Sequence, residues 1–251
     1  MIHSFLMIGQ SNMAGRGDLK EAPPLNSDRI AVLRNGRWQP LFRPINPDRP
    51  FSGFCLAESF AQDYAAAHPG VTVGLIPCAD GGTSLNQWRV GGLLFDHAVM
   101  QAVLASRTST IAGILWHQGE ADCSPALFPL YEEKLTCIIA GLRAIPELAD
   151  VPFIAGGLGD YLPGFAGDPH ASNYSHINET LRQMTAKVER FGFADAEGLA
   201  HKGDYLHFST PSLIELGHRY YRVFSRLEDK DKVFSDKPDM DAAFRTDMEK
   251  L

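Results

Sequence analysis

Short hydrophobic runs alternate with longer segments of helical spacing along most of the chain. Apolar runs of about four to eight residues are typical of buried strands, and apolar residues three or four apart are typical of helices. The runs predict strands at 2–8, 30–34, 71–76, 111–116, from 151, and at 191–195. The spaced segments predict helices at 54–67, 94–106, 125–144, 173–190 and 211–227.

This alternation predicts the fold class. Strands separated by helices of about ten residues or more favour a parallel sheet with helices on both faces. The expected fold is therefore α/β, a doubly wound, flavodoxin-like parallel sheet sandwiched between helices. In such sheets ligands bind outside the carboxyl ends of the strands, so functional residues are expected just after each strand.

Length indicates a single catalytic domain. A chain of 251 residues with 45% hydrophobic content can bury one large core, which we expect over residues 1–228. Residues 229–251, rich in Lys and Asp with few apolar anchors, are expected to form a C-terminal surface segment. The four cysteines, Cys55, Cys78, Cys123 and Cys137, show no C-x-x-C spacing and are expected to be free, buried thiols.

Charge and hydropathy exclude two classes of partner. The net charge is -7, from 30 acidic and 23 basic residues, and no block of Lys or Arg would neutralise phosphates, so nucleic acid is not expected. No apolar run reaches the roughly 18 residues of a membrane span. The start, MIHSFLMIGQSNM, has neither a basic segment nor a cleavage site of small residues. This predicts no signal peptide and a cytoplasmic location.

A serine follows the first predicted strand, in Gly9-Gln10-Ser11-Asn12. Between a strand and a helical turn, a serine hydroxyl can be exposed and its backbone N–H can point at an anion. This position suits a nucleophile. The same pattern also occurs at an ordinary turn or helix cap.

Paired glycines follow the strand at 71–76, in Asp80-Gly81-Gly82-Thr83. Glycine lets a backbone approach a ligand closely and leaves an N–H free to donate, as an oxyanion site requires. The alternative interpretation is a simple flexible turn.

A dense polar cluster, His117-Gln118-Gly119-Glu120-Ala121-Asp122, follows the strand at 111–116. The Gln118 amide is a further candidate donor to an oxyanion. The H-x-x-E spacing brings two kinds of metal ligand together, but no second histidine lies at helical spacing, so no metal is expected.

The fourth cluster is Asp204-Tyr205-Leu206-His207, just before the last predicted helix. Thr210 and Pro211 are typical of a helix start, so His207 is expected in the loop that precedes it. Asp204 can turn back to accept a hydrogen bond from Nδ1 of His207, which leaves Nε2 free to take a proton from a serine.

Four segments together resemble the SGNH hydrolases, and within them the sialate O-acetylesterase-like group that includes the family 6 carbohydrate esterases. The segments lie in the family's order and span most of the chain: GQSNMAGRG at 9–17, GGTSLNQW at 81–88, WHQGEAD at 116–122 and DYLHF at 204–208. The sequence departs from the pattern at Tyr205, where relatives often carry glycine.

The resemblance implies a role for each cluster. Ser11 would be the nucleophile, and its N–H would form the oxyanion hole with the N–H of Gly82 and the amide of Gln118. His207 would be the general base and then the acid. Asp204 is the first choice for the carboxylate that orients His207, and the alternative is Glu120.

The implied reaction is removal of an O-acetyl group from a carbohydrate through an acetyl-enzyme, with no cofactor. The substrate would be an acetylated sugar or oligosaccharide, and acetylxylan and acetylated sialic acid both stay open. One alternative is an SGNH esterase or lipase for another small acyl ester. Another is a carbohydrate-binding relative that has lost catalysis, against which the full set of candidate residues argues.

Overall fold

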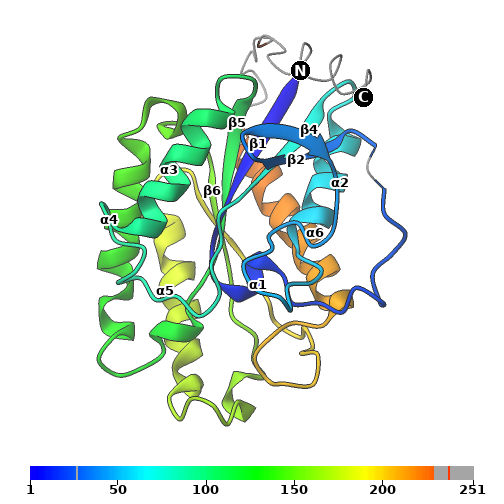
Figure 1. Cartoon of the computed structure of the whole chain (residues 1–251). Coiled ribbons are helices and arrows are strands. Elements are labelled where there is room, and N and C mark those ends of the chain that lie inside the picture. The colour runs from blue at the N-terminus through cyan, green and yellow to red at the C-terminus, as the bar shows by residue number, and fades with distance from the viewer. Residues whose placement is uncertain (27, 229–236, 238–251) are drawn as a thin grey trace.

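The computed structural model describes residues 1–26, 28–228 and 237, and Figure 1 shows a central sheet between helices. The predicted surface segment at 229–251 lies outside the described residues, apart from Lys237. The strands are β1 (Ile2–Gly9), β2 (Ile30–Arg34), β3 (Arg37–Pro40), β4 (Thr72–Pro77), β5 (Thr110–His117), β6 (Phe153–Gly156) and β7 (Phe191–Ala194). The α-helices are α1 (Ser11–Ala14), α2 (Ala57–Ala67), α3 (Leu93–Ala105), α4 (Tyr131–Arg143), α5 (Tyr174–Lys187) and α6 (Thr210–Leu227).

The sheet has the order β3-β2-β4-β1-β5-β6-β7. Its parallel core β4-β1-β5-β6-β7 is the doubly wound order 2-1-3-4-5, which confirms the predicted fold class. The edge was not predicted in full. Strand β3 pairs antiparallel with β2, so the sheet is mostly rather than wholly parallel.

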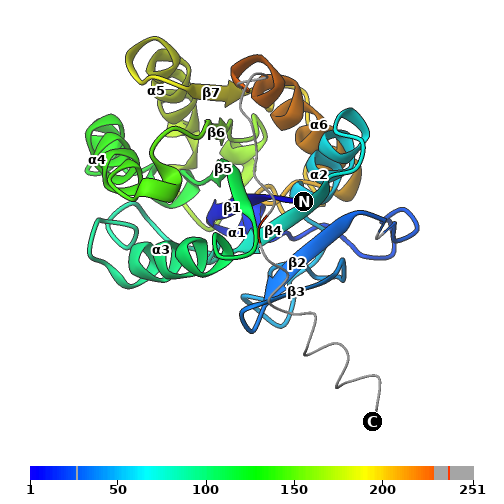
Figure 2. The same ribbon diagram turned by 90° about the horizontal axis from the view of Figure 1, so that it is seen from above.

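Two hydrophobic cores lie on opposite faces of the sheet, beneath the two groups of helices that Figure 2 shows on either side of it. Helices α3, α4 and α5 cover one face, and α2 and α6 cover the other. Strand β1 lies in the middle and is buried throughout from His3 to Gly9, because both of its neighbours are parallel strands and both of its faces are covered. The central strand therefore delivers the residue after Gly9 to a fixed position.

Strand β4 pairs with one edge of β1 and β5 with the other, so the order of strands reverses at β1. The carboxyl end of β1 is therefore the topological switch point of the sheet. Gly9 is required here: a Cβ on it would lie 2.2 Å from the carbonyl oxygen of His117, and its φ of +128° suits only glycine. The close approach lets the N–H of Gln10 donate to the carbonyl of His117 at 2.8 Å. The segments after β1 and β5 are thereby joined at the carboxyl edge, where ligands bind in this class of fold.

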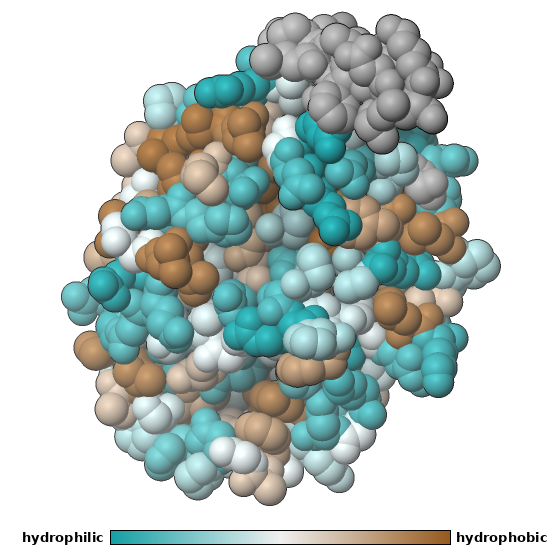
Figure 3. All heavy atoms as spheres, viewed as in Figure 1, coloured by the Kyte–Doolittle hydropathy of each residue, from teal (hydrophilic) through white to brown (hydrophobic). Residues whose placement is uncertain are grey.

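On the face of the molecule shown in Figure 3, hydrophobic residues form small groups among hydrophilic ones. No helix in the described part of the chain is long and apolar enough to cross a membrane. All four cysteines are free thiols, as expected. Cys55, Cys78 and Cys123 are buried, but Cys137 is exposed on α4, so the expectation of burial is wrong for that residue.

Candidate active site

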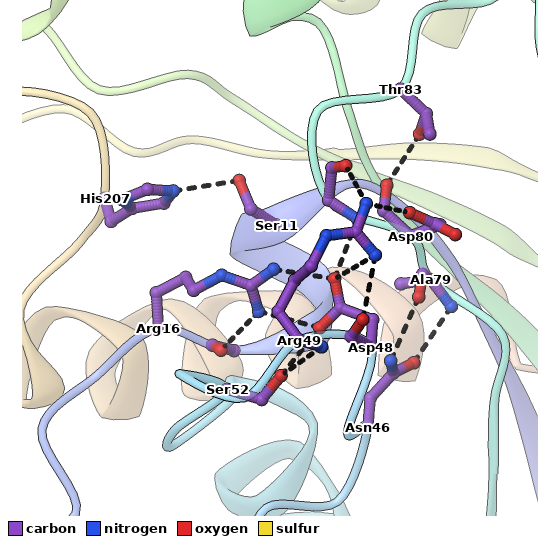
Figure 4. Close-up of polar contacts among 12 residues, drawn as sticks. Ser11, Arg16, Asn46, Asp48, Arg49, Ser52, Ala79, Asp80, Thr83 and His207 are labelled. Carbon is purple, nitrogen blue, oxygen red and sulfur yellow. Dashed lines mark hydrogen bonds and ion pairs between the residues drawn. The ribbon is translucent and has the colours of Figure 1, made fainter.

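Ser11 lies directly after β1, as the first residue of the short helix α1. Its backbone N–H belongs to the first turn, where a helix has no internal acceptor for it. The residue is buried and exposes only 5% of its surface. Figure 4 shows its hydroxyl pointing toward His207, which comes from the loop before α6.

Three side chains are brought into a chain of hydrogen bonds. Nε2 of His207 lies 3.1 Å from Oγ of Ser11, and Nδ1 of His207 lies 2.7 Å from Oδ2 of Asp204. With the Nδ1 proton donated to Asp204, Nε2 is the acceptor for the Ser11 hydroxyl. Asp204 also accepts the backbone N–H groups of Leu206 at 3.0 Å and His207 at 2.8 Å. The carboxylate therefore folds the loop and contacts the imidazole at once.

Tyr205, where the sequence departs from the family pattern, adopts a backbone conformation that glycine takes readily. Its φ is +57°, in the left-handed region. Its ring stacks on His201, with centroids 4.1 Å apart. The tyrosine thus leaves the turn intact, and Asp204 still reaches His207.

The protonation states follow from burial and pairing. Burial lowers the pKa of His207 below 6.5, against the opposing effect of Asp204, whose hydrogen bond and charge raise it. Burial alone would raise the pKa of Asp204, but the hydrogen bonds from His207 and Leu206 outweigh it, and the pKa is lowered. At neutral pH the pair is a neutral imidazole beside a carboxylate, which is the state that accepts a proton from serine.

Asn12 connects the nucleophile to the histidine loop, a role that sequence reasoning missed. Its amide donates to the carbonyl of Leu206 at 3.2 Å and accepts from the N–H of Phe208 at 3.2 Å. These two backbone groups flank His207. Its position directly after Ser11 in the motif was the only signal in the sequence.

Glu120 contacts Asn12 rather than His207. Its Oε1 accepts the second amide proton of Asn12 at 2.6 Å and lies 3.8 Å from Nε2 of His117. Burial raises the pKa of Glu120 to about 7, a shift that the Asn12 bond opposes and the charge of Asp122 adds to. Of the two candidate carboxylates, Asp204 is therefore the one beside His207.

The glycine pair lies against the serine. A Cβ placed on Gly81 would be 3.4 Å from the Cβ of Ser11. The N–H of Gly81 is already bonded to Oδ2 of Asp48 at 2.8 Å. In the described part of the chain, by contrast, the N–H groups of Gly82 and Ser11 have no acceptor, and Gly82 has a φ of +78° with open space beside it. These two N–H groups are therefore free to donate to a ligand.

Gln118 does not offer a free donor, which corrects the prediction that its amide faces an oxyanion. Its Nε2 donates to the carbonyl of Thr83 at 3.1 Å and to Oδ2 of Asp122 at 2.5 Å, so both amide protons are occupied. The same Asp122 oxygen accepts the N–H of Leu85 at 3.0 Å. Gln118 and Asp122 together support the segment that follows Gly82.

Three pockets lie along the segments that carry these residues. A pocket of about 170 Å³ lies beside Gly82 and is lined mainly by apolar groups, among them Leu162, Phe165 and Leu206. A pocket of about 590 Å³ lies on another side of Gly82 and includes Arg49 and Gln87. The third, of about 580 Å³, is lined by residues around Arg16: Gly17, Asp18, Leu19, Glu21, Phe51, Ser52, Gly53, His201, Lys202 and Ser209. Trp88 and Trp116 line none of the three; they are buried and pack edge to face in the core.

Within the described residues, no three His, Cys, Asp or Glu side chains are grouped as metal ligands would be. Comparison with known proteins gives the family. The model of the carbohydrate esterases described as sialic acid-specific acetylesterases matches residues 1–226. The chain belongs to this carbohydrate esterase family. Its fold is that of the SGNH hydrolases, as the resemblance implied.

Relatives of the family agree over most of the chain. A probable carbohydrate esterase of Arabidopsis thaliana is 27% identical over 236 residues, which cover 85% of this chain and 86% of the relative. The crystal structure of that Arabidopsis protein has a TM-score of 0.80 at 26% identity, over 89% of this chain and 98% of the other.

More distant structures share the fold. The crystal structure of NanS has a TM-score of 0.70 at 15% identity and covers 90% of this chain and 97% of its own. A carbohydrate acetylesterase from Xanthomonas citri has a TM-score of 0.66 at 20% identity, over 89% of this chain and 57% of its own. This esterase family therefore accounts for the motifs at the ends of β1, β4 and β5.

Proposed function

We propose that this esterase removes O-acetyl groups from a carbohydrate through an acetyl-enzyme on Ser11. The observation that carries the proposal is the hydrogen-bonded series Ser11, His207 and Asp204, with separations of 3.1 Å and 2.7 Å. A serine hydroxyl is a weak nucleophile until an adjacent base accepts its proton. Here the base is held in the required tautomer by a carboxylate on its other nitrogen.

The first step forms a bond between Oγ of Ser11 and the ester carbonyl carbon, while the serine proton passes to Nε2 of His207. The negative charge that develops on the carbonyl oxygen is stabilised by the N–H groups of Ser11 and Gly82. The bond to the sugar oxygen then breaks, and His207 returns the proton to the leaving alcohol. Water, deprotonated by His207, hydrolyses the acetyl-serine and restores the enzyme.

The pockets match the two parts of such a substrate. The apolar pocket of about 170 Å³ beside Gly82 suits a short acyl group. The larger pockets contain arginines, carboxylates and the exposed ring of Phe51, groups that bind hydroxyls and sugar faces. This division favours a small acyl group on a polar alcohol over a long-chain lipid.

The test is a rate comparison on acetylated xylo-oligosaccharide, O-acetyl sialic acid and p-nitrophenyl esters of two to eight carbons. We expect hydrolysis of p-nitrophenyl acetate to be much faster than that of the octanoate. Octanoate hydrolysed at an equal or greater rate would instead support an esterase or lipase for other acyl esters. The better of the two acetylated sugars identifies the substrate class.

A serine-directed fluorophosphonate tests the nucleophile. We expect it to label the wild type at Ser11, while Ser11→Ala is neither labelled nor active, with a loss on the order of 10³-fold or more. Labelling at Ser84 or Ser209 would assign the nucleophile elsewhere. A wild-type protein that binds acetylated sugars without any labelling or turnover would point to a non-catalytic carbohydrate-binding relative.

A further inference from the structure

The backbone donor at Gly82 depends on the orientation of one peptide unit. The N–H of Gly82 and the C=O of Gly81 belong to the same planar, trans peptide, so the two groups point in opposite directions. Glycine permits many backbone conformations on both sides of this peptide. Something outside the pair must therefore fix which way the Gly82 N–H points.

Two consecutive residues of a distant loop hold Gly81 from both ends. Asp48 accepts the N–H of Gly81 at 2.8 Å. Arg49 donates from Nη2 to the C=O of Gly81 at 3.0 Å, and the same guanidinium is bonded to Oδ1 of Asp80 at 2.7 Å. Figure 4 shows Asp48 and Arg49 beside the loop that leads to Thr83, with Ser11 close by. A flip of the Gly81–Gly82 peptide would break the Arg49 bond.

Asp48 is itself held rigidly. Arg16 donates to both of its oxygens, from Nη1 to Oδ1 at 2.9 Å and from Nη2 to Oδ2 at 2.6 Å. The hydroxyl of Ser52 donates to Oδ1 at 2.7 Å. The side chains of Arg16 and Asp48 are only 2% and 4% exposed. Both oxygens of this buried carboxylate are hydrogen-bonded, so the carboxylate cannot shift without breaking these bonds. The N–H of Gly81, which donates to Oδ2, is held in place with it.

The ion pair of Arg16 and Asp48 also lies in close contact with the glycine segment. A Cβ on Gly81 would lie 2.5 Å from Nη2 of Arg16 and 2.9 Å from Oδ2 of Asp48. The ion pair therefore packs directly on the backbone of Gly81. On its other side, the segment is held at Thr83 by Gln118, so Gly82 lies between two anchored neighbours and keeps its own N–H free.

We propose that Asp48 and Arg49 are positioning residues for the oxyanion hole, which hold the Gly81–Gly82 peptide so that the Gly82 N–H faces the reacting carbonyl. The inference rests on the proposed esterase function of Ser11. Neither side chain touches the substrate's reacting atoms in this role. Their effect is exerted through the backbone donor, which must be in place before the transition state forms.

The chain offers a matched control for Asp48. Arg43 and Glu58 form a second buried arginine–carboxylate pair, with Glu58 side chain 1% exposed and Arg43 Nε 2.8 Å from Oε2 of Glu58. Asp48→Asn and Glu58→Gln each remove one buried charge and leave an arginine without its partner. Both should lower Tm, and only Asp48→Asn should affect the peptide at Gly82.

The exposed position of Arg49 gives a second variant that does not threaten folding. Its side chain is 39% exposed, and its pair with Asp80 resembles the exposed pair of Arg182 with Asp195, also 2.7 Å. Arg49→Met removes the contact with the Gly81 carbonyl. Arg182→Met removes an equivalent surface pair elsewhere and is the control.

The measurements are kcat and KM on p-nitrophenyl acetate, the inhibition constant of a boronic acid, and Tm. A boronic acid bound to serine places an oxygen in the hole and so reports on the hole itself. We expect Asp48→Asn to lower kcat roughly 10- to 100-fold and Arg49→Met about 5- to 10-fold, below or near the cost of a lost oxyanion donor. KM should stay within about twofold, and boronate affinity should fall by the same factor as kcat. Glu58→Gln and Arg182→Met should keep wild-type kcat.

The outcomes separate this inference from the function on which it rests. Asp48→Asn and Arg49→Met with the turnover and boronate affinity of their controls would overturn the positioning role while the esterase stands. If Asp48→Asn does not fold, Arg49→Met decides alone. A wild-type protein with no esterase activity would overturn the proposed function and, with it, this role.

Discussion

At the carboxyl edge of the sheet, two segments each carry a histidine and a carboxylate three residues apart, yet the two pairs are built differently. In the loop before α6, Asp204 Oδ2 lies 2.7 Å from His207, and the Asp204 side chain is 36% exposed. At the end of β5, Glu120 Oε1 lies 3.8 Å from Nε2 of His117, the last residue of the strand, and the two side chains are 5% and 0% exposed. The same spacing therefore gives one close, partly exposed pair and one separated, buried pair.

The balance between burial and hydrogen bonding sets the charge of each pair. The hydrogen bonds to Asp204 lower its pKa despite burial, so it is ionised at neutral pH. Burial raises the pKa of Glu120 to about 7 and lowers that of His117 to about 3. An imidazolium that forms during acyl transfer is stabilised by an ionised neighbour in contact with it. The first segment is suited to proton transfer, and the second to supporting the backbone around Asn12 and Gly82.

The largest expected effect is that of Asp204→Asn. The asparagine Oδ1 can still accept the N–H groups of Leu206 and His207, so the loop should keep its fold. Its Nδ2 would meet Nδ1 of His207 as a donor and favour the wrong tautomer. We expect turnover to fall at least several hundred-fold, toward the roughly 10⁴-fold cost of the orienting Asp in a triad. Steady-state kinetics with Tm as the folding control test this, and an Asp204→Asn protein with nearly wild-type kcat would remove Asp204 from the mechanism.

The next effect, from Gln118→Ala, sharpens the comparison for the buried loop. Removing the amide frees the Thr83 carbonyl and leaves the N–H of Leu85 as the remaining donor to Asp122, so both the segment around Gly82 and the fold lose support. We expect kcat to fall on the order of tenfold together with a lower Tm, less than the roughly 10²- to 10³-fold of a lost oxyanion donor. A 10²-fold loss at unchanged Tm would return Gln118 to the oxyanion hole.

The part of the site that depends on neighbouring positions in the chain could be predicted from the sequence. Asp204 and His207 lie in one loop, and Ser11 and Gly82 directly follow predicted strands. Contacts between distant segments could not be predicted: the bond from Gly81 to Asp48 joins positions 33 apart, and that from Asn12 to Glu120 joins positions 108 apart.

Two differences between the sequence prediction and the structure, at β3 and at Gln118, also have physical causes. β3 has a single large apolar residue, Trp38, among polar ones, so its four residues give no strand period. Gln118 was expected to donate to a ligand because an amide has free protons in the sequence, and only packing shows that Thr83 and Asp122 take both.

A smaller effect concerns the pH dependence of kcat/KM. The base form of His207 is required, and burial lowers its pKa, so the acid limb of the profile should have its midpoint below pH 6.5. Asp204 opposes that shift because a carboxylate stabilises the imidazolium. In Asp204→Asn the residual activity should therefore have an acid limb at still lower pH. A limb that moves to higher pH would mean that another group controls the profile.

The smallest effect on turnover, and the sharpest on stability, is that of Glu120→Gln. The Gln side chain can still accept the amide proton of Asn12. The loss in kcat should therefore be much smaller than the roughly 10²-fold that a lost acid–base group costs. The free energy of unfolding should depend on pH through the titration of Glu120. The folded-state pKa of about 7 is raised above the ordinary 4.5, so Glu120 stabilises the fold when protonated, and this contribution is lost as pH rises from about 4.5 through 7. Wild-type Tm should therefore decline relative to that of Glu120→Gln between pH 5 and 8, by on the order of 5 °C. If the two Tm curves stay parallel, Glu120 is ionised in the fold; if Glu120→Gln loses more activity than Asp204→Asn while folded, Glu120 and not Asp204 orients His207.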